Sequence, residues 1–343
     1  HFSFDKRLYS ESDVTPELID KLQTLCTAKY DAPTYPVEEF RQTILHEMKT
    51  EIHTMAELND NFIGCIHRQL TDRHMLYTKE FTSDGCLAQD TFSGVLKVTV
   101  LVFNVLLDNT QYTLTVSGHP VGQGVIAPNF NLMDTVKTAA GNTGASNAAE
   151  SADNSCEAES APASAVATAG SSGVSGAGST ATAGDSSTTG SSSAGNTVTA
   201  STRFKRLELH NHTVESDGSL TCQELTEYLA ADHVDAFAIT DHNTTSGQKK
   251  IEQLLEEKHY PISLIRGMEY TTYFGHILCL NLAKYVPWNS IDRHRPELLF
   301  EAAREKGALV GIAHPFSYGD PFARGCRFEM TVSDYSKVDF IEI

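Results

Sequence analysis

The chain has 343 residues, a formal net charge of −18 and 40% hydrophobic residues. No apolar run reaches the roughly 18 residues of a membrane-spanning helix. The acidic excess argues against membrane-surface binding and against stable binding of duplex nucleic acid, since both need clustered Lys and Arg. The 7 cysteines form no C-x-x-C pair, so neither a disulfide framework nor a thiolate zinc site is indicated, and we expect a reducing, cytoplasmic location.

Residues 1–134 are predicted to form a small α+β region. A first helix begins at Thr15-Pro16 and carries a leucine-rich face. A second helix is predicted over Val37 to Glu57, because apolar side chains recur there at helical spacing. Strands are predicted over 95–107 and 112–116, joined as a hairpin near Asp108-Asn109. The patterns of this region indicate no function.

Histidines recur at a spacing of seven residues in this first region. His46 and His53 would share one face of the predicted second helix, and His67 and His74 repeat the spacing. No carboxylates converge on either pair in the sequence, so we interpret all four as solvated surface histidines.

Residues 135–202 consist mostly of Ala, Gly, Ser and Thr, with a few acids and isolated valines. Such a segment cannot bury enough apolar surface to offset the conformational entropy lost on folding. We therefore expect a disordered linker between two regions.

Residues 203–343 alternate between predicted strands and predicted helices. The strands are expected at 207–209, 236–239, 262–265, 277–282, 309–312 and 338–343. The helices are expected at 222–231, 248–258 and 297–306, the last with Pro296 at its start and Gly307 after its end. This alternation predicts an α/β fold with a parallel sheet and crossover helices.

Potential metal ligands follow the ends of these strands. His210 and His212 come after the first strand, and alternate residues of a strand point to one side, so both imidazoles can hold one ion. A turn at 216–218 can return the Asp217 carboxylate over that strand end. Three later strands end close to His242, Glu269 and His314. Functional residues of parallel α/β folds gather at the carboxyl ends of strands, so these side chains predict one polar site.

Asp241 precedes His242 and has two interpretations. Asp is a favoured helix N-cap, and a cap would explain its position. Ligating histidines, however, commonly donate their second N–H to a carboxylate. We favour this supporting role for Asp241.

Four segments, LHNHTVESDG, ITDHNTTSG, GMEYTTYFGH and IAHPFSYG, resemble successive motifs of the polymerase and histidinol phosphatase (PHP) family. The resemblance covers about Arg203 to Ile343. In detail these segments are similar to the CehA/McbA-type metallohydrolases, a subgroup that includes carbamate-hydrolysing enzymes. The resemblance implies a distorted (β/α)7 barrel that holds two or three divalent ions.

The resemblance also implies which residues hold the ions. His210 and His212 would hold a first ion, which Glu269 would bridge to a second. His276 and His314 would complete the second ion. His276 precedes its apolar run instead of following it, so its place at the site comes from the resemblance alone.

Asp217 and His242 would belong to a third ion. Mixed imidazole and carboxylate ligands suit Zn, Mn or Fe. PHP sites usually end with an Asp-x-His pair after a seventh strand, whereas this sequence stops in its sixth. We expect a fragment truncated before its last strand, because an apolar edge strand invites aggregation.

The predicted activity is metal-dependent hydrolysis. Divalent ions lower the pKa of a water towards neutrality and so supply a hydroxide nucleophile, and no G-x-S-x-G motif indicates a serine route. Glu269, Asp241 and Arg324 are the catalytic candidates; Arg324 would stabilise negative charge on the substrate, or is a solvated loop residue. The expected substrate is a phosphoester (nucleotide, oligonucleotide or sugar phosphate). A carbamate, amide or carboxyl ester is the second possibility, and a non-catalytic metal-binding module the third.

Overall fold

The computed structural model describes residues 1–30, 33–67, 70–78, 80–118, 205–288, 291–319 and 321–343. The linker predicted at 135–202 lies outside these residues. The described residues on both sides of it belong to one compact unit. No helix in the described ranges is long and apolar enough to cross a membrane.

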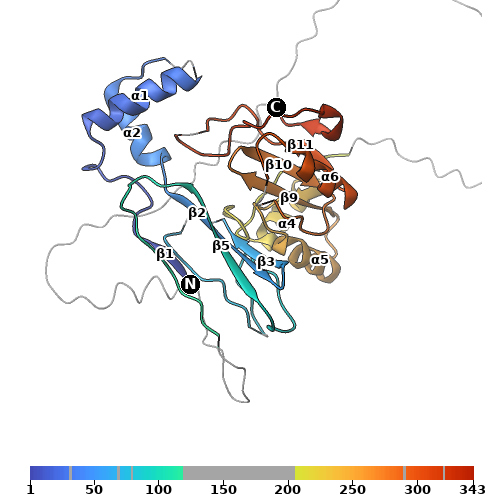
Figure 1. The fold of residues 1–343 in the computed structure, drawn as a ribbon. Coiled ribbons are helices and arrows are strands. Elements are labelled where there is room, and N and C mark those ends of the chain that lie inside the picture. The colour runs from blue at the N-terminus through green and yellow to red at the C-terminus, as the bar shows by residue number, and fades with distance from the viewer. Residues whose placement is uncertain (31–32, 68–69, 79, 119–204, 289–290, 320) are drawn as a thin grey trace, which may run out of the picture. The chain divides into compact units, whose positions relative to one another are not determined.

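The predicted α/β character of the C-terminal region is confirmed. Its strands form one six-stranded sheet in the order β12-β11-β10-β9-β8-β7, part of which is labelled in Figure 1. The strands are β7 (Leu207–Glu208), β8 (Ala236–Ile239), β9 (Ser263–Thr272), β10 (Gly275–Leu280), β11 (Leu309–Ile312) and β12 (Phe340–Ile341). The helices are α4 (Cys222–Ala231), α5 (Ser246–Lys258) and α6 (Glu297–Glu305).

The ends of these helices follow from local sequence. The Thr221 hydroxyl caps α4 by accepting a hydrogen bond from Glu224 N. The Glu224 carboxylate accepts one from Thr221 N, which completes a capping box. Gly307 follows α6 with φ +87°, a conformation that glycine adopts without steric cost.

The prediction of a parallel sheet is wrong for its central strand. β10 runs antiparallel to both β9 and β11, whereas β7, β8 and β9 are mutually parallel, as are β11 and β12. Only two residues separate Thr272 from Gly275, and a parallel crossover needs a dozen or more. The first residues of β10 therefore lie at the edge where its neighbours end.

The second predicted helix is too long. α1 (Pro16–Tyr30) is present, but α2 covers only Val37–Glu47, and Met48 is already extended. The following segment forms β2 (Glu51–Leu58), in which every residue is buried. A strand buried on both faces loses its alternation, so its apolar residues could be mistaken for a helical stripe.

The hairpin predicted near Asp108-Asn109 is also wrong, although both strands exist. β5 (Leu96–Asn104) pairs with β2, while β6 (Tyr112–Leu114) pairs with β1 (Phe2–Phe4). β3 (Asn61–Ile66) is the second neighbour of β2, and β4 (Asp72–Arg73) is the second neighbour of β1. A tight turn at Asn59-Asp60, both with positive φ, joins β2 to β3. Pairing between distant strands has no local sequence signal, so it was not predicted.

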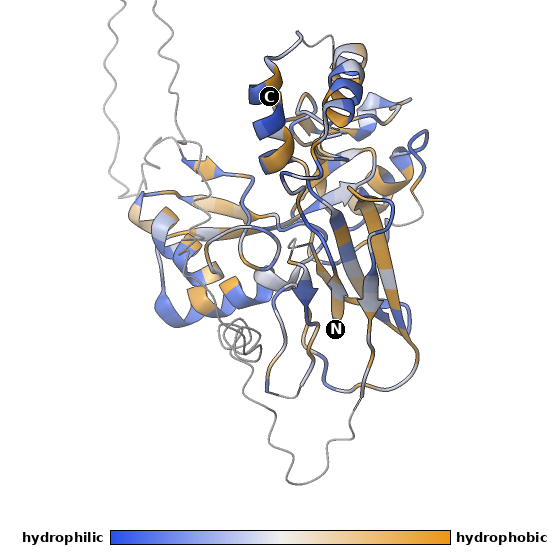
Figure 2. Cartoon of the chain, turned by 90° about the vertical axis from the view of Figure 1, so that its left-hand side faces the viewer, coloured by the Kyte–Doolittle hydropathy of each residue, from blue (hydrophilic) through white to orange (hydrophobic). Residues whose placement is uncertain are grey.

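The two sequence regions share a hydrophobic core. Met55, Cys65 and Phe103 of the first region pack in one buried cluster with Met268 and Tyr270 of the second. Hydrophobic residues are coloured orange along the strands in Figure 2. This common core fixes β2, β3 and β5 against the sheet that carries the predicted ligands.

Candidate metal centre

Glu269 lies at the centre of the site, and its side chain is fully buried. Within the described residues, its two carboxylate oxygens contact ring nitrogens of five histidines at 2.8 to 3.2 Å: His210, His212, His242, His276 and His314. The contacts divide between the oxygens, with three to Oε2 and two to Oε1. Every imidazole that the sequence assigned to metal binding is therefore brought to one carboxylate.

The sheet explains this convergence. β9 is the strand that carries Glu269, and its backbone is held to the neighbouring strand end by Glu269 N donating to Thr240 O and Asn243 N donating to Glu269 O. His242 forms a parallel bridge with Glu269 at the end of β8. His276 stands at the start of the antiparallel β10, and His314 follows β11 with φ +24°.

The charges of this cluster are strongly coupled. Burial would raise the pKa of Glu269, but the surrounding imidazoles, His242 and His276 first, hold it well below its ordinary value. Burial disfavours a charged His210, yet hydrogen bonds with Glu269 and Glu342 raise its pKa to about 10. Burial lowers the pKa of His242 well below its ordinary value. Ionisation of the Glu269 carboxylate is thus favoured, while the pKa values of His210 and His242 are shifted in opposite directions.

These residues fit divalent ions. A carboxylate has about four acceptor positions, fewer than the five imidazoles around Glu269. Nε2 of His276 is buried and has no hydrogen-bond partner in the described residues, as expected of a ligand atom. Two groups of ligand atoms lie within 4.8 Å of one another: His210, Glu269 and His314, and His212, His242 and Glu269. Imidazole and carboxylate ligands suit Zn, Mn or Fe.

Asp217 lies beside this ring. Its carboxylate is 3.6 Å from His242 Nε2, 3.9 Å from His212 Nδ1 and 3.5 Å from His67 Nε2. Burial would raise the pKa of Asp217, but the nearby His242 and His67 lower it. The ionised Asp217 faces the site from the turn after β7, where the sequence placed it.

The interpretation of the four early histidines as surface residues is wrong for two of them. His53 and His67 are buried, whereas His46 and His74 are exposed as expected. His67 stacks on His242 with ring centroids 4.1 Å apart, and His53 packs edge-on against His67 at the same distance. Their helical spacing suggested an exposed face, but β2 and β3 place both inside the molecule.

Glu342 is a site residue that sequence reasoning missed. Its carboxylate contacts His210 Nδ1 at 3.0 Å and accepts a hydrogen bond from His314 N at 2.9 Å. It follows β12 as the predicted ligands follow their own strands, and that position was the available signal. The contact leaves His210 Nε2 directed at Glu269.

Asp241 supports the site through a turn. It accepts hydrogen bonds from Thr213 N at 2.7 Å, Thr213 Oγ1 at 2.8 Å and Ser216 Oγ at 2.6 Å. Ser216 Oγ in turn lies 3.5 Å from His212 Nδ1. In the hydrogen bonds of the described residues, Asp241 reaches a histidine only through Ser216. It fixes the turn that presents Asp217.

Arg324 is exposed, and no hydrogen bond or ion pair joins it to any described residue. Its loop does reach the site, because Cys326 O lies 3.2 Å from His314 Nδ1. Tyr273 is close enough for the positive charge of Arg324 to offset part of the increase in pKa that burial causes. The structure leaves Arg324 outside the ring of ligands.

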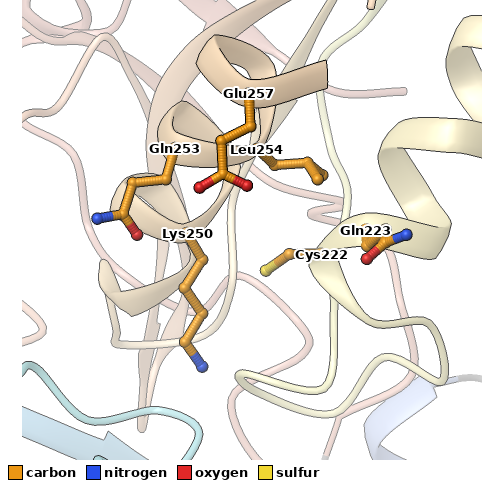
Figure 3. Close-up of a pocket in the computed structure, with 6 residues that line it drawn as sticks. All are labelled: Cys222, Gln223, Lys250, Gln253, Leu254 and Glu257. Carbon is orange, nitrogen blue, oxygen red and sulfur yellow. The ribbon is translucent and has the colours of Figure 1, made fainter. Parts of the chain in front are cut away.

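A small hollow of about 250 Å³ lies between α4 and α5 (Figure 3). Its lining residues are Cys222, Gln223, Lys250, Gln253, Leu254 and Glu257. None of these is a candidate ligand, so the hollow is separate from the chemistry predicted here.

The arrangement defines a candidate site for divalent metal, as the PHP resemblance implied. Residues 1–120 match a family of unknown function (DUF6669). The chain is 34% identical over 133 residues to the 5'-3' exoribonuclease Rnm of Escherichia coli strain K12. This match covers 34% of the chain and 45% of the relative, so the chain spans less than half of that protein. The exoribonuclease named there agrees with the predicted hydrolase.

Two solved structures overlap with parts of the chain. One is a two-domain protein from Bacteroides vulgatus described as containing a predicted PHP-like metal-dependent phosphoesterase: TM-score 0.29, 23% identity, covering 33% of this chain and 35% of that one. The other is a protein from Bifidobacterium adolescentis provisionally described as a metal-dependent phosphoesterase. It has a TM-score of 0.30 and 16% identity, and the match covers 40% of this chain and 77% of that one.

Proposed function

We propose that this protein is a metal-dependent phosphoesterase whose substrates are nucleotides or short oligonucleotides. The observation that carries the proposal is the buried Glu269 carboxylate with five imidazoles around it. The similarity to an exoribonuclease supports a phosphodiester substrate. The cytoplasmic location remains a prediction.

His210, His212 and Glu269 would hold a first ion, and Glu269 would bridge it to a second held by His276 and His314. When bound, such ions lower the pKa of a water molecule and polarise the bond to be broken. Glu342 keeps His210 oriented through its contact at 3.0 Å.

Asp241 and Arg324 have different proposed roles. Asp241 is a positioning residue, because it holds Thr213 and Ser216 and thereby the turn that carries Asp217. Arg324 is exposed on a loop tied to His314 through Cys326, where its guanidinium can meet a phosphate group from the solvent side.

Charge favours short substrates. With a net charge of −18, the chain repels a long polyanion, while a small phosphoester is attracted by local cations and bound metal. Sugar phosphates, which the sequence analysis also named, are small phosphoesters too and fit the same argument from charge. The resemblance to the CehA/McbA-type subgroup instead predicts that the protein hydrolyses carbamates.

The test is an activity panel on the full chain loaded with Mn or Zn. The panel contains a 5'-phosphorylated oligoribonucleotide, a phosphodiester, a phosphomonoester, a carbamate and a carboxyl ester. His210→Ala should abolish turnover, and His46→Ala, an exposed histidine on α2, should leave it unchanged.

Phosphoester turnover that needs metal and is lost in His210→Ala supports the proposal. Turnover of the carbamate or ester alone would replace it with the second possibility from the sequence. Tight metal binding without any turnover would favour the non-catalytic module.

A further inference from the structure

We propose that His67, from the region matched by the family of unknown function, is a metal ligand that completes a third subsite with Asp217 and His242. The inference rests on the proposed function, because it assigns one more ligand to the same centre. It gives residues 1–120 a chemical role that their sequence did not indicate.

The distances among the three side chains suit an ion. His67 Nε2 and His242 Nε2 lie 3.5 and 3.6 Å from the same oxygen, Asp217 Oδ2. These separations exceed the 2.7 to 3.2 Å of an ordinary N–H···O hydrogen bond. Ligands about 2.1 Å from a tetrahedral ion lie roughly 3.4 Å from one another. The ligand atoms of His67, Asp217 and His242 all fall within 4.8 Å of one another.

His67 is held in place from two sides. It follows β3, and its ring stacks on His242 with centroids 4.1 Å apart. On its other side lies the His53 ring, and His53 Nε2 contacts Glu51 Oε1 at 3.1 Å. All three residues of the first region are buried, so the position of His67 is fixed by packing and not by a mobile loop.

Two further hydrogen bonds hold the regions together near this point. Gly85 N donates to Glu215 Oε2 at 3.0 Å, and Thr244 Oγ1 donates to Gly85 O at 2.9 Å. Thr244 lies two residues after His242, and Glu215 two residues before Asp217. The chain segments that carry Asp217 and His242 are therefore both fastened to the region that carries His67.

A purely structural role for His67 makes different predictions. His67 could simply orient Asp217 by donating a hydrogen bond to it, as a positioning residue. In that case its removal would weaken the site without removing a metal–ligand bond. The experiment must therefore detect a bond between residue 67 and the metal.

The first measurement is metal stoichiometry and affinity for the full chain titrated with Zn²⁺ or Co²⁺. His67→Ala should bind one ion fewer, or weaken the weakest ion by more than the roughly 10- to 100-fold that loss of a supporting contact costs, while the other ions are retained. His46→Ala, an exposed histidine of α2 in the same region, should bind as the wild type does.

The second measurement uses His67→Cys loaded with Co²⁺. A thiolate ligand gives a sulfur-to-cobalt charge-transfer absorption, which should appear in His67→Cys and not in the wild type or in His46→Cys. The band reports direct ligation even where the alanine variant is unstable, and it needs no activity.

The outcomes separate the inference from the proposed function. Loss of an ion in His67→Ala together with the new band supports a ligand. Unchanged stoichiometry and affinity in His67→Ala would overturn the inference, as would a weakened site without the band in His67→Cys. In either case phosphoester turnover by the wild type would still stand. A wild type that binds no metal would refute both.

Discussion

His276 Nδ1 and Glu269 Oε1 lie 2.8 Å apart across the antiparallel pair formed by β9 and β10. In that pair His276 is directly opposite Thr271, and Glu269 is opposite Leu278, so the two residues are diagonal neighbours on one face. Reversal of the chain at Tyr273-Phe274 is what brings the start of β10 to the functional edge of the sheet.

Replacing Glu269 should remove the centre. In Glu269→Gln the carboxylate charge and one ligand oxygen are lost, and we expect kcat/KM to fall about 1,000-fold or more, equivalent to about 4 kcal/mol of transition-state stabilisation. Metal content and turnover should be measured together. Glu252→Gln, which alters a half-buried partner of Arg266, is the control. Normal metal content in Glu269→Gln would contradict its proposed role as a bridge.

A glycine in the loop after β11 should be needed to hold His314. Gly325 has φ +90°, and an added Cβ would lie 2.2 Å from Thr272 O. Gly325→Ala should therefore shift the neighbouring Cys326 carbonyl that faces His314 Nδ1, lowering both metal affinity and unfolding temperature.

Gly307→Ala provides the matched control for that loop. Gly307 also has positive φ, +87°, but the nearest atom to an added Cβ is 3.8 Å away. It should cost only about 1–2 kcal/mol of stability from the backbone conformation and leave metal affinity unchanged. Equal effects of the two substitutions would show that crowding at Gly325 has no functional consequence.

The stability of the folded protein should depend on the ion pair between the buried Glu215 and Lys250. Burial raises the pKa of Glu215, and its ion pair with Lys250 opposes this. Lys250→Met leaves the carboxylate buried without its cation, a change that costs about 3–5 kcal/mol for a fully buried pair. Because the Lys250 side chain is 40% exposed, we expect about 2–3 kcal/mol. Chemical denaturation measures this loss. Lys249→Met, at an exposed neighbour, should change stability by less than about 0.5 kcal/mol.

Metal binding should release a proton from His210. In the metal-free protein, burial disfavours the imidazolium but Glu269 and Glu342 raise the pKa of His210 to about 10, so this residue is charged at neutral pH. An ion must displace that proton, and affinity should rise as pH increases, by up to about tenfold per pH unit for one proton. Calorimetry in buffers of different ionisation enthalpy counts the protons, and His210→Gln should release about one fewer.

The raised pKa of His210 affects the stability of the metal-free protein in the opposite direction: stability falls with increasing pH, whereas metal affinity rises. A raised pKa in the folded state means that the charged His210 stabilises folding fully below its ordinary pKa of 6.5, and this contribution is lost as pH rises through about 10. The difference in unfolding free energy between wild type and His210→Gln, measured in chelator, should shrink over that interval. A difference that grows with pH would contradict the assignment.

The sequence by itself determined the candidate ligands that follow parallel strands. His210, His212, His242 and His314 each come at or just after a strand end, and apolar runs predict such ends locally. Parallel strands place their carboxyl ends at one edge, so convergence followed from strand order alone. Glu342 obeys the same rule.

Strand order does not place the remaining candidate residues, His276 and His67; the tertiary structure shows how they reach the site. His276 reaches the edge because β10 is antiparallel, and His67 reaches it because β3 packs beside the C-terminal sheet in a shared core. Strand direction and long-range packing depend on contacts between segments far apart in the chain. Local periodicity carries no information about such contacts. For this reason the sequence predicted a helix where β2 lies and a surface position for His67.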